Sequence, residues 1–223
     1  MKTTVIIPAA GTGSRMGCRK CMLLLDGIPV LYRTISAFDN HDEIDEMVIV
    51  ASKDEFDVIS DYKFKKPYKI TIGGCDRQSS VRAGIDALCC DVTNVLIHDA
   101  ARPLVTNKII SDTLAVVMQG HCAVSGVKTK DTVKVTDEKN KVQDTPARDN
   151  IWIVQTPQGF PHHIIKEAHK QAYETGFNGT DDAVLVERLG LPVCMVDGDY
   201  SNIKLTTPDD MIIAEALIKN GRR

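Results

Sequence analysis

The sequence predicts an α/β protein with a mainly parallel sheet that helices cover on both faces. Short runs rich in β-branched residues alternate with segments of helical periodicity along almost the whole chain. The strand-like runs, such as 4–8 (TVIIP) and 47–51 (MVIVA), are continuously apolar, which is typical of strands buried on both faces. The 223 residues, 43% hydrophobic and 26% charged, fit one globular domain over 1–223.

The expected elements follow one another in alternating order. Strands are expected at 4–8, 47–51, 68–72, 94–98, 122–127, 151–155 and 192–196, and helices at 29–38, 79–88, 107–119, 161–174, from 180 and from 208. Pro29 suits the first turn of its helix, and Ser79 or Ser80 is expected to cap the helix 79–88. Ligand sites in such sheets lie at the carboxyl ends of the strands.

Residues 128–148 interrupt this alternation. Residues 132–135 alternate polar and apolar side chains, 137–140 are turn-like, and 141–143 alternate again, which predicts a protruding β-hairpin arm. An isolated hairpin is only marginally stable, so we expect the arm to pack on something else, such as a second copy of the chain. The alternative is a mobile surface hairpin.

Composition excludes several classes of protein. The net charge of −3 argues against a nucleic-acid-binding face. No stretch approaches the roughly 18 apolar residues of a membrane span. Seven cysteines, an odd number, indicate free thiols in a reducing cytoplasm rather than a disulfide framework. Cys18 and Cys21 lack the second pair that a zinc site needs.

A loop of small residues directly follows the first strand. It comprises Pro8, Ala9, Ala10, Gly11 and Gly13, followed by the cations Arg15 and Lys20. Small residues let backbone N–H groups approach phosphates, so the loop suits a polyphosphate. Met16 stands at the third glycine position of the dinucleotide fingerprint, and Cys21 follows Lys20 where a P-loop needs Ser or Thr. A strand-to-helix turn without a ligand is the remaining alternative.

Two further segments follow strands. The pair Gly73-Gly74 precedes a helix start, a place where an anionic or base-edge ligand can bind. Asp99 lies in 98–103 (HDAARP), and a carboxylate at a strand end beside phosphates is a reasonable Mg²⁺ ligand. The alternative for this segment is a structural ion pair between Asp99 and Arg102.

These motifs together carry a family resemblance. The segments 8–16, 73–81, 98–103, 156–158 and 202–206 occur in the order found in the 2-C-methyl-D-erythritol 4-phosphate cytidylyltransferases, and the chain resembles that family over nearly its whole length. The resemblance implies a Rossmann-like three-layer nucleotidyltransferase fold and a homodimer formed through the arm. It also implies Mg²⁺-dependent cytidylyl transfer from CTP to methylerythritol phosphate, with release of pyrophosphate, in non-mevalonate isoprenoid precursor synthesis.

The resemblance also implies residue roles. Arg15 and Lys20 match the pair that stabilises the transition state, and Arg148 and Lys204 match the pair that positions the acceptor phosphate. Matches around the nucleotide are Pro8, Ala9, Ala10, Gly11, Gly13, Gly74, Ser80, Asp99 and Ala100, with Asp99 at the metal, and matches on the acceptor side are Arg102, Thr132 and Thr156. Because the attacking group is already an anion, no general base is needed.

The chain departs from the family pattern in two places. The loop between Arg15 and Lys20 is short, so Arg19 could replace Lys20, and Cys75 stands where an acidic residue is common. Two alternatives therefore stay open: a ribitol-5-phosphate cytidylyltransferase, which the small pair Ala100-Ala101 disfavours, and a non-catalytic nucleotide-binding homologue.

Overall fold

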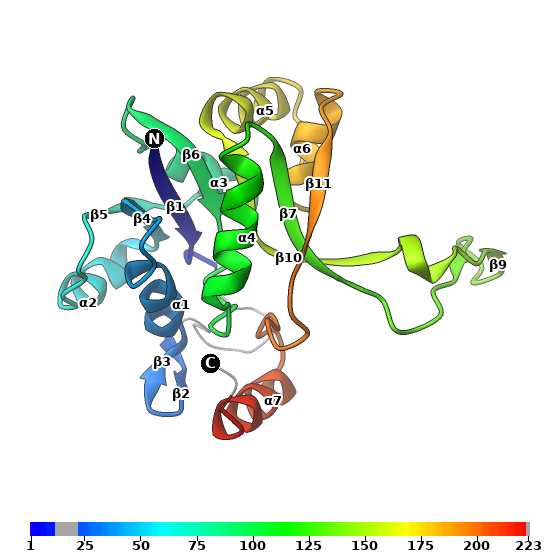
Figure 1. Cartoon of the computed structure of the whole chain (residues 1–223), viewed down its shortest axis with the longest axis horizontal. Helices are drawn as coiled ribbons and strands as arrows, with labels where there is room; N and C mark the ends of the chain where they lie inside the picture. Colours follow the sequence, from blue (N-terminus) through cyan, green and yellow to red (C-terminus); the bar gives the residue numbers. More distant parts are fainter. Residues whose placement is uncertain (12–21, 222–223) are drawn as a thin grey trace.

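A seven-stranded sheet forms the centre of the molecule (Figure 1). The computed structural model describes residues 1–11 and 22–221. The strands of this sheet, in chain order, are β1 (Lys2–Pro8), β4 (Glu46–Ala51), β5 (Tyr68–Ile72), β6 (Val92–Ile97), β7 (Cys122–Lys128), β10 (Trp152–Pro161) and β11 (Val193–Asp197). Their order is β11-β7-β10-β6-β1-β4-β5, and β10 alone among them runs antiparallel to its neighbours. The predicted, mainly parallel α/β sheet is confirmed.

Helices cover both faces of this sheet. They are α1 (Val30–Asp39), α2 (Phe56–Ser60), α3 (Arg77–Asp86), α4 (Asn107–Val117), α5 (His162–Glu174) and α6 (Ala183–Arg188). A further helix, α7 (Pro208–Lys219), packs instead in a separate cluster with Leu25 and Val30. Side chains alternate along β1: Val5 and Ile7 join a core with α1 and α4, whereas Ile6 joins a core with α3, α5 and α6. A strand that buries both faces in this way is the reason for the continuous apolar runs in the sequence.

The start of α3 differs from the expectation. The helix begins at Arg77, and its N-cap is Asp76, neither Ser79 nor Ser80. The Asp76 side chain accepts a hydrogen bond from the Ser79 backbone N–H at 2.7 Å. Aspartate is a good N-cap, and a partner three residues later completes a capping box, so the helix starts two residues earlier than expected. Ser79 and Ser80 lie inside the first turn instead.

Short elements that the periodicity did not reveal complete the fold. β2 (Leu24–Leu25) and β3 (Ile28–Pro29) form a small antiparallel pair, so Pro29 ends a strand and α1 starts one residue later. α2 follows a 3₁₀ turn, Lys53–Glu55. Elements of two to five residues are too short to produce a readable hydrophobic period.

The segment between β7 and β10 projects from the body of the protein (Figure 1). It contains the antiparallel pair β8 (Val135–Thr136) and β9 (Val142–Asp144) and a 3₁₀ turn, Arg148–Asn150. Val135 and Val142 remain 47% and 57% exposed. None of the helices in the described ranges is long and apolar enough to cross a membrane.

Candidate functional site

Three of the predicted segments meet at the carboxyl edge of the sheet. The Ala9 N–H donates to the Val50 carbonyl at 2.7 Å, and the Gly73 N–H donates to the Ala51 carbonyl at 3.0 Å. Asp99 follows β6, which pairs with β1 on the other side. The parallel register therefore brings residues from distant parts of the sequence to one place.

The Gly73-Gly74 pair permits close packing at this edge. A Cβ on Gly73 would lie 2.2 Å from the Ala10 Cβ and 3.0 Å from the Ser80 Oγ. The Gly74 N–H donates to that same Ser80 Oγ at 3.1 Å. The structure thus brings Ala10, Gly74 and Ser80 together, which were assigned to the nucleotide from sequence. Any larger residue at position 73 would separate the two segments.

Asp99 is the centre of a cluster of cations. Its Oδ1 accepts a hydrogen bond from Arg77 Nε at 3.0 Å, its Oδ2 lies 2.7 Å from Lys204 Nζ, and Arg102 Nε lies 3.8 Å from the same oxygen. Asp99 is 7% exposed. Burial opposes its ionisation, but the charges of Arg77, Lys204 and Arg102 outweigh burial and hold the pKa of the carboxyl well below its usual range. Asp99 is therefore ionised throughout the physiological pH range.

A buried hydrogen-bond chain positions Asp99. The Asp99 N–H donates to Thr156 Oγ1 at 3.1 Å, and the Thr156 hydroxyl donates to His98 Nδ1, also at 3.1 Å. His98 Nε2 in turn donates to the Arg102 carbonyl at 3.1 Å. Burial lowers the pKa of His98 to about 4, so the imidazole is neutral. Its one proton is on Nε2, which faces a carbonyl, and Nδ1 is therefore the acceptor. The Thr156 hydroxyl is engaged in this chain and supports Asp99.

Arg102 connects the Asp99 loop to the segment that carries Lys204. Its NH1 donates to the Asn202 carbonyl at 2.7 Å, and the Leu205 N–H donates to the Ala101 carbonyl at 2.8 Å. The Lys204 side chain remains 39% exposed while it pairs with Asp99. Lys204 is thus positioned by the buried residues beside it, and its ammonium group faces both Asp99 and solvent.

Arg77, Asp182 and His169 extend this cluster, and none of the three was predicted from the sequence as a site residue. Arg77 NH2 lies 2.8 Å from Asp182 Oδ2, and His169 Nε2 lies 3.1 Å from Asp182 Oδ1. Arg77 had a usable signal, because it stands among the Gly pair and the serines of 73–81. Asp182 and His169 had none, because residues preceding a short helix and residues on a buried helix face are common in any α/β protein.

The remaining predicted site residues adjoin this edge of the sheet or fall outside the described ranges. Gly13, Arg15 and Lys20, with the alternative Arg19, fall in 12–21, which the structure does not describe. Pro8 ends β1, Gly11 is exposed just beyond it, and Ala100 is buried, with its carbonyl accepting from the Thr34 hydroxyl at 2.8 Å.

Thr132 and Arg148 lie on the projecting arm. Both are exposed, and Arg148 begins the 3₁₀ turn at the base of the arm. Within the described part of the chain, neither forms an ion pair or a side-chain hydrogen bond with Asp99, Arg77 or Lys204. A single chain therefore does not place these two residues in the Asp99 cluster.

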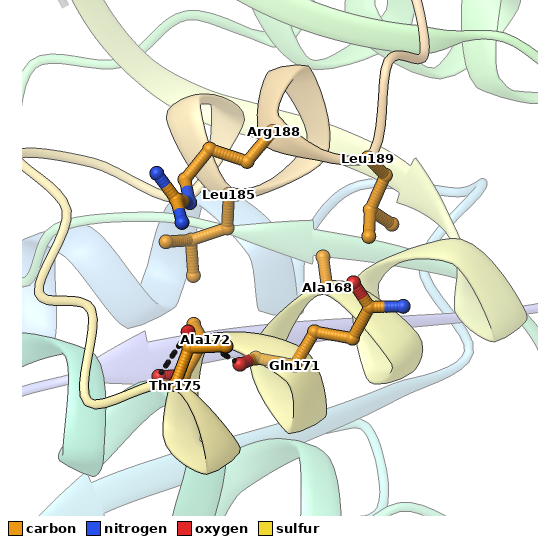
Figure 2. A pocket seen from close by; sticks show the side chains of 7 residues that line it. All are labelled: Ala168, Gln171, Ala172, Thr175, Leu185, Arg188 and Leu189. Atoms are coloured by element: carbon orange, nitrogen blue, oxygen red, sulfur yellow. Dashed lines mark hydrogen bonds between the residues drawn. The ribbon is translucent and has the colours of Figure 1, made fainter.

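A small pocket lies between α5 and α6 (Figure 2). Arg188 is its one charged lining residue, and that guanidinium stacks 3.9 Å above the Phe177 ring. The pocket shares no lining residue with the Asp99 cluster. It offers no set of cations for a triphosphate, so the candidate site is the carboxyl edge of the sheet.

The comparison with known proteins identifies the family. The model of the 2-C-methyl-D-erythritol 4-phosphate cytidylyltransferase family matches residues 3–220. The chain belongs to this family. A relative of that name from Caldanaerobacter subterraneus is 45% identical, with 98% of this chain and 100% of the relative covered, and one from Clostridium botulinum is 44% identical, with 98% of each covered.

Solved structures agree with this assignment. A 4-diphosphocytidyl-2C-methyl-D-erythritol synthase from Anaerococcus prevotii superimposes with a TM-score of 0.91 at 33% identity, covering 98% of this chain and 96% of that one. A cytidylyltransferase of the same family from Thermus thermophilus gives a TM-score of 0.80 at 32% identity, covering 98% of this chain and all of that one. The predicted cytidylyltransferase fold is confirmed.

The donor set around Asp99 fits one kind of metal site. No group of three or more His, Cys, Asp and Glu residues gathers for a metal ion in ranges 1–11 and 22–221. Magnesium commonly binds one or two carboxylates together with substrate phosphates, and it retains several waters. A single ionised carboxylate at a strand end therefore suits a magnesium ion that arrives with a triphosphate, and a cytidylyltransferase uses such a substrate.

Proposed function

We propose that this chain performs its family's reaction, cytidylyl transfer from CTP to 2-C-methyl-D-erythritol 4-phosphate, at the Asp99 cluster. The observation that carries the proposal is the ion pair between Asp99 and Lys204, 2.7 Å from Oδ2 to Nζ. It joins the nucleotide side of the sheet edge to the segment expected to bind the acceptor. A structural role alone would not require a half-exposed lysine beside a buried carboxylate at this edge.

The chemistry requires positioning rather than proton abstraction. An acceptor phosphate oxygen attacks the α-phosphorus of CTP, the bond to the β-phosphate oxygen breaks, and pyrophosphate leaves with the electron pair. The acceptor is already an anion, so the obstacle is repulsion between two phosphates and the charge that grows on the leaving group. Preorganised cations reduce both. Lys204 and Arg102, which both face Asp99, are proposed to supply this charge for the acceptor phosphate, and Arg15 and Lys20 are proposed to act on the triphosphate.

The ionised Asp99 provides an anchor on the nucleotide side. Asp99 would hold a magnesium ion that arrives with the triphosphate, and the ion would supply neutralisation of phosphate charge there. The backbone of Ala9, Ala10 and Gly11, with Gly74 and Ser80 opposite, would line the nucleotide. In the chain as described, Lys204 neutralises Asp99. We expect Lys204 to exchange that contact for the acceptor phosphate when both substrates bind.

A second copy of the chain is proposed to complete each site. Thr132 and Arg148 are exposed on the arm, and Val135 and Val142 are uncovered there as well. An arm that reaches a neighbouring subunit would bury these valines and deliver Arg148 to the neighbour's acceptor phosphate.

The five described cysteines are free, in keeping with a reducing cytoplasm.

Mixing two inactive variants tests the shared site. Arg148→Ala and Lys204→Ala homodimers should each release little pyrophosphate. After subunit exchange, each mixed dimer contains one site with both residues intact, so the mixture should recover about a quarter of wild-type turnover. Mixing Arg148→Ala with itself is the control. No recovery in subunits shown to have exchanged would place both residues in one chain's site.

The acceptor and the metal are tested in one assay of pyrophosphate release from CTP. We expect faster release with methylerythritol phosphate than with ribitol 5-phosphate, and loss of release when EDTA removes the divalent ion. Faster release with ribitol 5-phosphate would reverse the assignment of the acceptor. CTP binding without any release, with Mg²⁺ present, would indicate a non-catalytic homologue.

A further inference from the structure

A second buried carboxylate lies behind Asp99, on the far side of Arg77. The Arg77 guanidinium bridges the two, with Nε 3.0 Å from Asp99 Oδ1 and NH2 2.8 Å from Asp182 Oδ2. Asp182 is 1% exposed. Because a buried carboxylate is costly unless it is paired, its presence directly behind a substrate-side cluster calls for an explanation.

Asp182 is held rigidly from several directions. His169 Nε2 donates to its Oδ1 at 3.1 Å, and the Asp182 N–H donates to Gln158 Oε1 at 3.1 Å. The preceding loop is fixed to α3, since the Gly179 N–H donates to Gln78 Oε1 at 2.8 Å. Asp182 therefore cannot follow Arg77 if that side chain moves, and Arg77 must adapt to Asp182.

Asp182 affects how much positive charge stands beside Asp99. Arg77, Arg102 and Lys204 all face Asp99. Lys204 is exposed enough to leave for an acceptor phosphate, but Arg77 is not free to leave, because Asp182 holds its other end. Without the negative charge at 182, the whole guanidinium would be available to Asp99, and one more uncompensated positive charge would stand beside any divalent ion there.

We propose that Asp182 is a positioning residue that draws Arg77 partly away from Asp99 and so sets how strongly Asp99 holds the divalent cation accompanying the triphosphate. The inference rests on the metal role of Asp99 in the proposed function. His169 and Gln158 act through Asp182, because they fix its carboxylate and backbone. Arg77 is thus shared between a site carboxylate and a structural one, and the sharing keeps Asp99 available.

Asp182→Asn tests this link, because it removes the charge and keeps nearly the same shape. Mn²⁺ binding is followed by water-proton relaxation with saturating CTP and no acceptor, so no turnover occurs. We expect the variant to bind Mn²⁺ about ten- to a hundredfold more weakly than the wild type. Turnover with both substrates should recover at high Mn²⁺, which a distorted site would not allow. Asp182→Glu, which keeps the charge, should restore most of the affinity.

The adjacent Asp181 provides a matched control. Its carboxylate accepts from Gln158 Nε2 at 2.7 Å and from the Val184 N–H at 3.0 Å, and both donors are uncharged. Asp181→Asn should keep wild-type Mn²⁺ affinity. If Asp182→Asn does not fold, Arg77→Lys tests the same link, since a single ammonium cannot bridge two carboxylates as a guanidinium does. Because that ammonium pairs with one carboxylate or the other, Mn²⁺ affinity should change, falling if the ammonium pairs with Asp99 and rising if it pairs with Asp182.

The outcomes separate this inference from the proposed function. Equal Mn²⁺ affinity in wild type and Asp182→Asn, an equal fall in Asp181→Asn, or turnover that stays low at saturating Mn²⁺ would each overturn the positioning role. If Asp182→Asn does not fold, unchanged Mn²⁺ affinity in Arg77→Lys would overturn it too. A wild type that binds no Mn²⁺ beyond that held by free CTP would instead overturn the metal role of Asp99, and this inference with it.

Discussion

His98 should make this protein sensitive to mild acid. The imidazole is fully buried, it packs 4.9 Å from the Phe38 ring between centroids, and both of its nitrogens are engaged. A proton added to Nδ1 would point at the Thr156 hydroxyl. That hydroxyl would then have to rotate, and the hydrogen bond that it now donates to Nδ1 would be lost. The folded protein therefore resists protonation of His98, whereas the unfolded chain accepts a proton at the ordinary pKa of histidine.

The magnitude follows from the two pKa values. Burial lowers the pKa of His98 from 6.5 to about 4. Between these values the unfolded state binds more protons than the folded state, so stability is complete above the unfolded pKa and falls as the pH drops through that interval. From about pH 7.5 to about pH 4.5, this one group should remove about 2 to 3 kcal/mol from the free energy of unfolding.

Urea unfolding of wild type and His98→Asn at both pH values measures this effect. The asparagine carbonyl can accept a hydrogen bond from Thr156, and the side chain does not titrate. Any stability that the substitution itself removes is therefore the same at both pH values and cancels from the difference between them. We expect the wild type to lose about 2 to 3 kcal/mol more than the variant between the two pH values. Carboxylates that titrate in both proteins cancel as well. The same loss in both proteins would show that His98 is not the titrating group.

Three further predictions concern the site. Lys204→Ala should lower turnover at saturating CTP by about 10²–10³-fold while CTP binding, followed by calorimetry, changes little; near-normal turnover would remove Lys204 from the site. Asp99→Asn should abolish most turnover. It should also lower the free energy of unfolding in urea by about 3 kcal/mol, because the neighbouring cations lose their buried partner. Unchanged stability would contradict the ion-pair cluster. Gly73→Ala should reduce kcat/KM for CTP by about tenfold or more, because its Cβ would overlap Ala10; unaltered steady-state kinetics would show that the two segments can separate without cost.

Local patterns were sufficient to predict most of the sheet. The continuous apolar runs identified β1, β4 and β7 closely, because a strand buried on both faces has few acceptable residue types. The predicted start of α3 was wrong, because Asp76, Ser79 and Ser80 are all residue types that can cap a helix. Only the backbone geometry shows that Asp76 is the N-cap. The reversal of β10 relative to its neighbours was also invisible, since strand direction leaves no mark on a short apolar run.

Some residues of the candidate site were also predictable from the sequence, whereas others were not. Asp99 stood out because a charged residue directly after a buried strand is unusual, and Gly73-Gly74 because two glycines there imply close backbone approach. Lys204 entered only through the family resemblance. The bridge from Asp99 through Arg77 to Asp182 joins β6, α3 and the loop before α6, and no spacing within one segment could reveal it.

The sequence by itself determined the layered α/β architecture, the sheet edge at which ligands bind and the family to which the chain belongs, because hydrophobic period and strand-end residues are local properties. The tertiary structure alone decided which charges neutralise one another. An ion pair depends on distances of a few ångströms and on the exclusion of water, and folding sets both between residues about 20 to 100 positions apart.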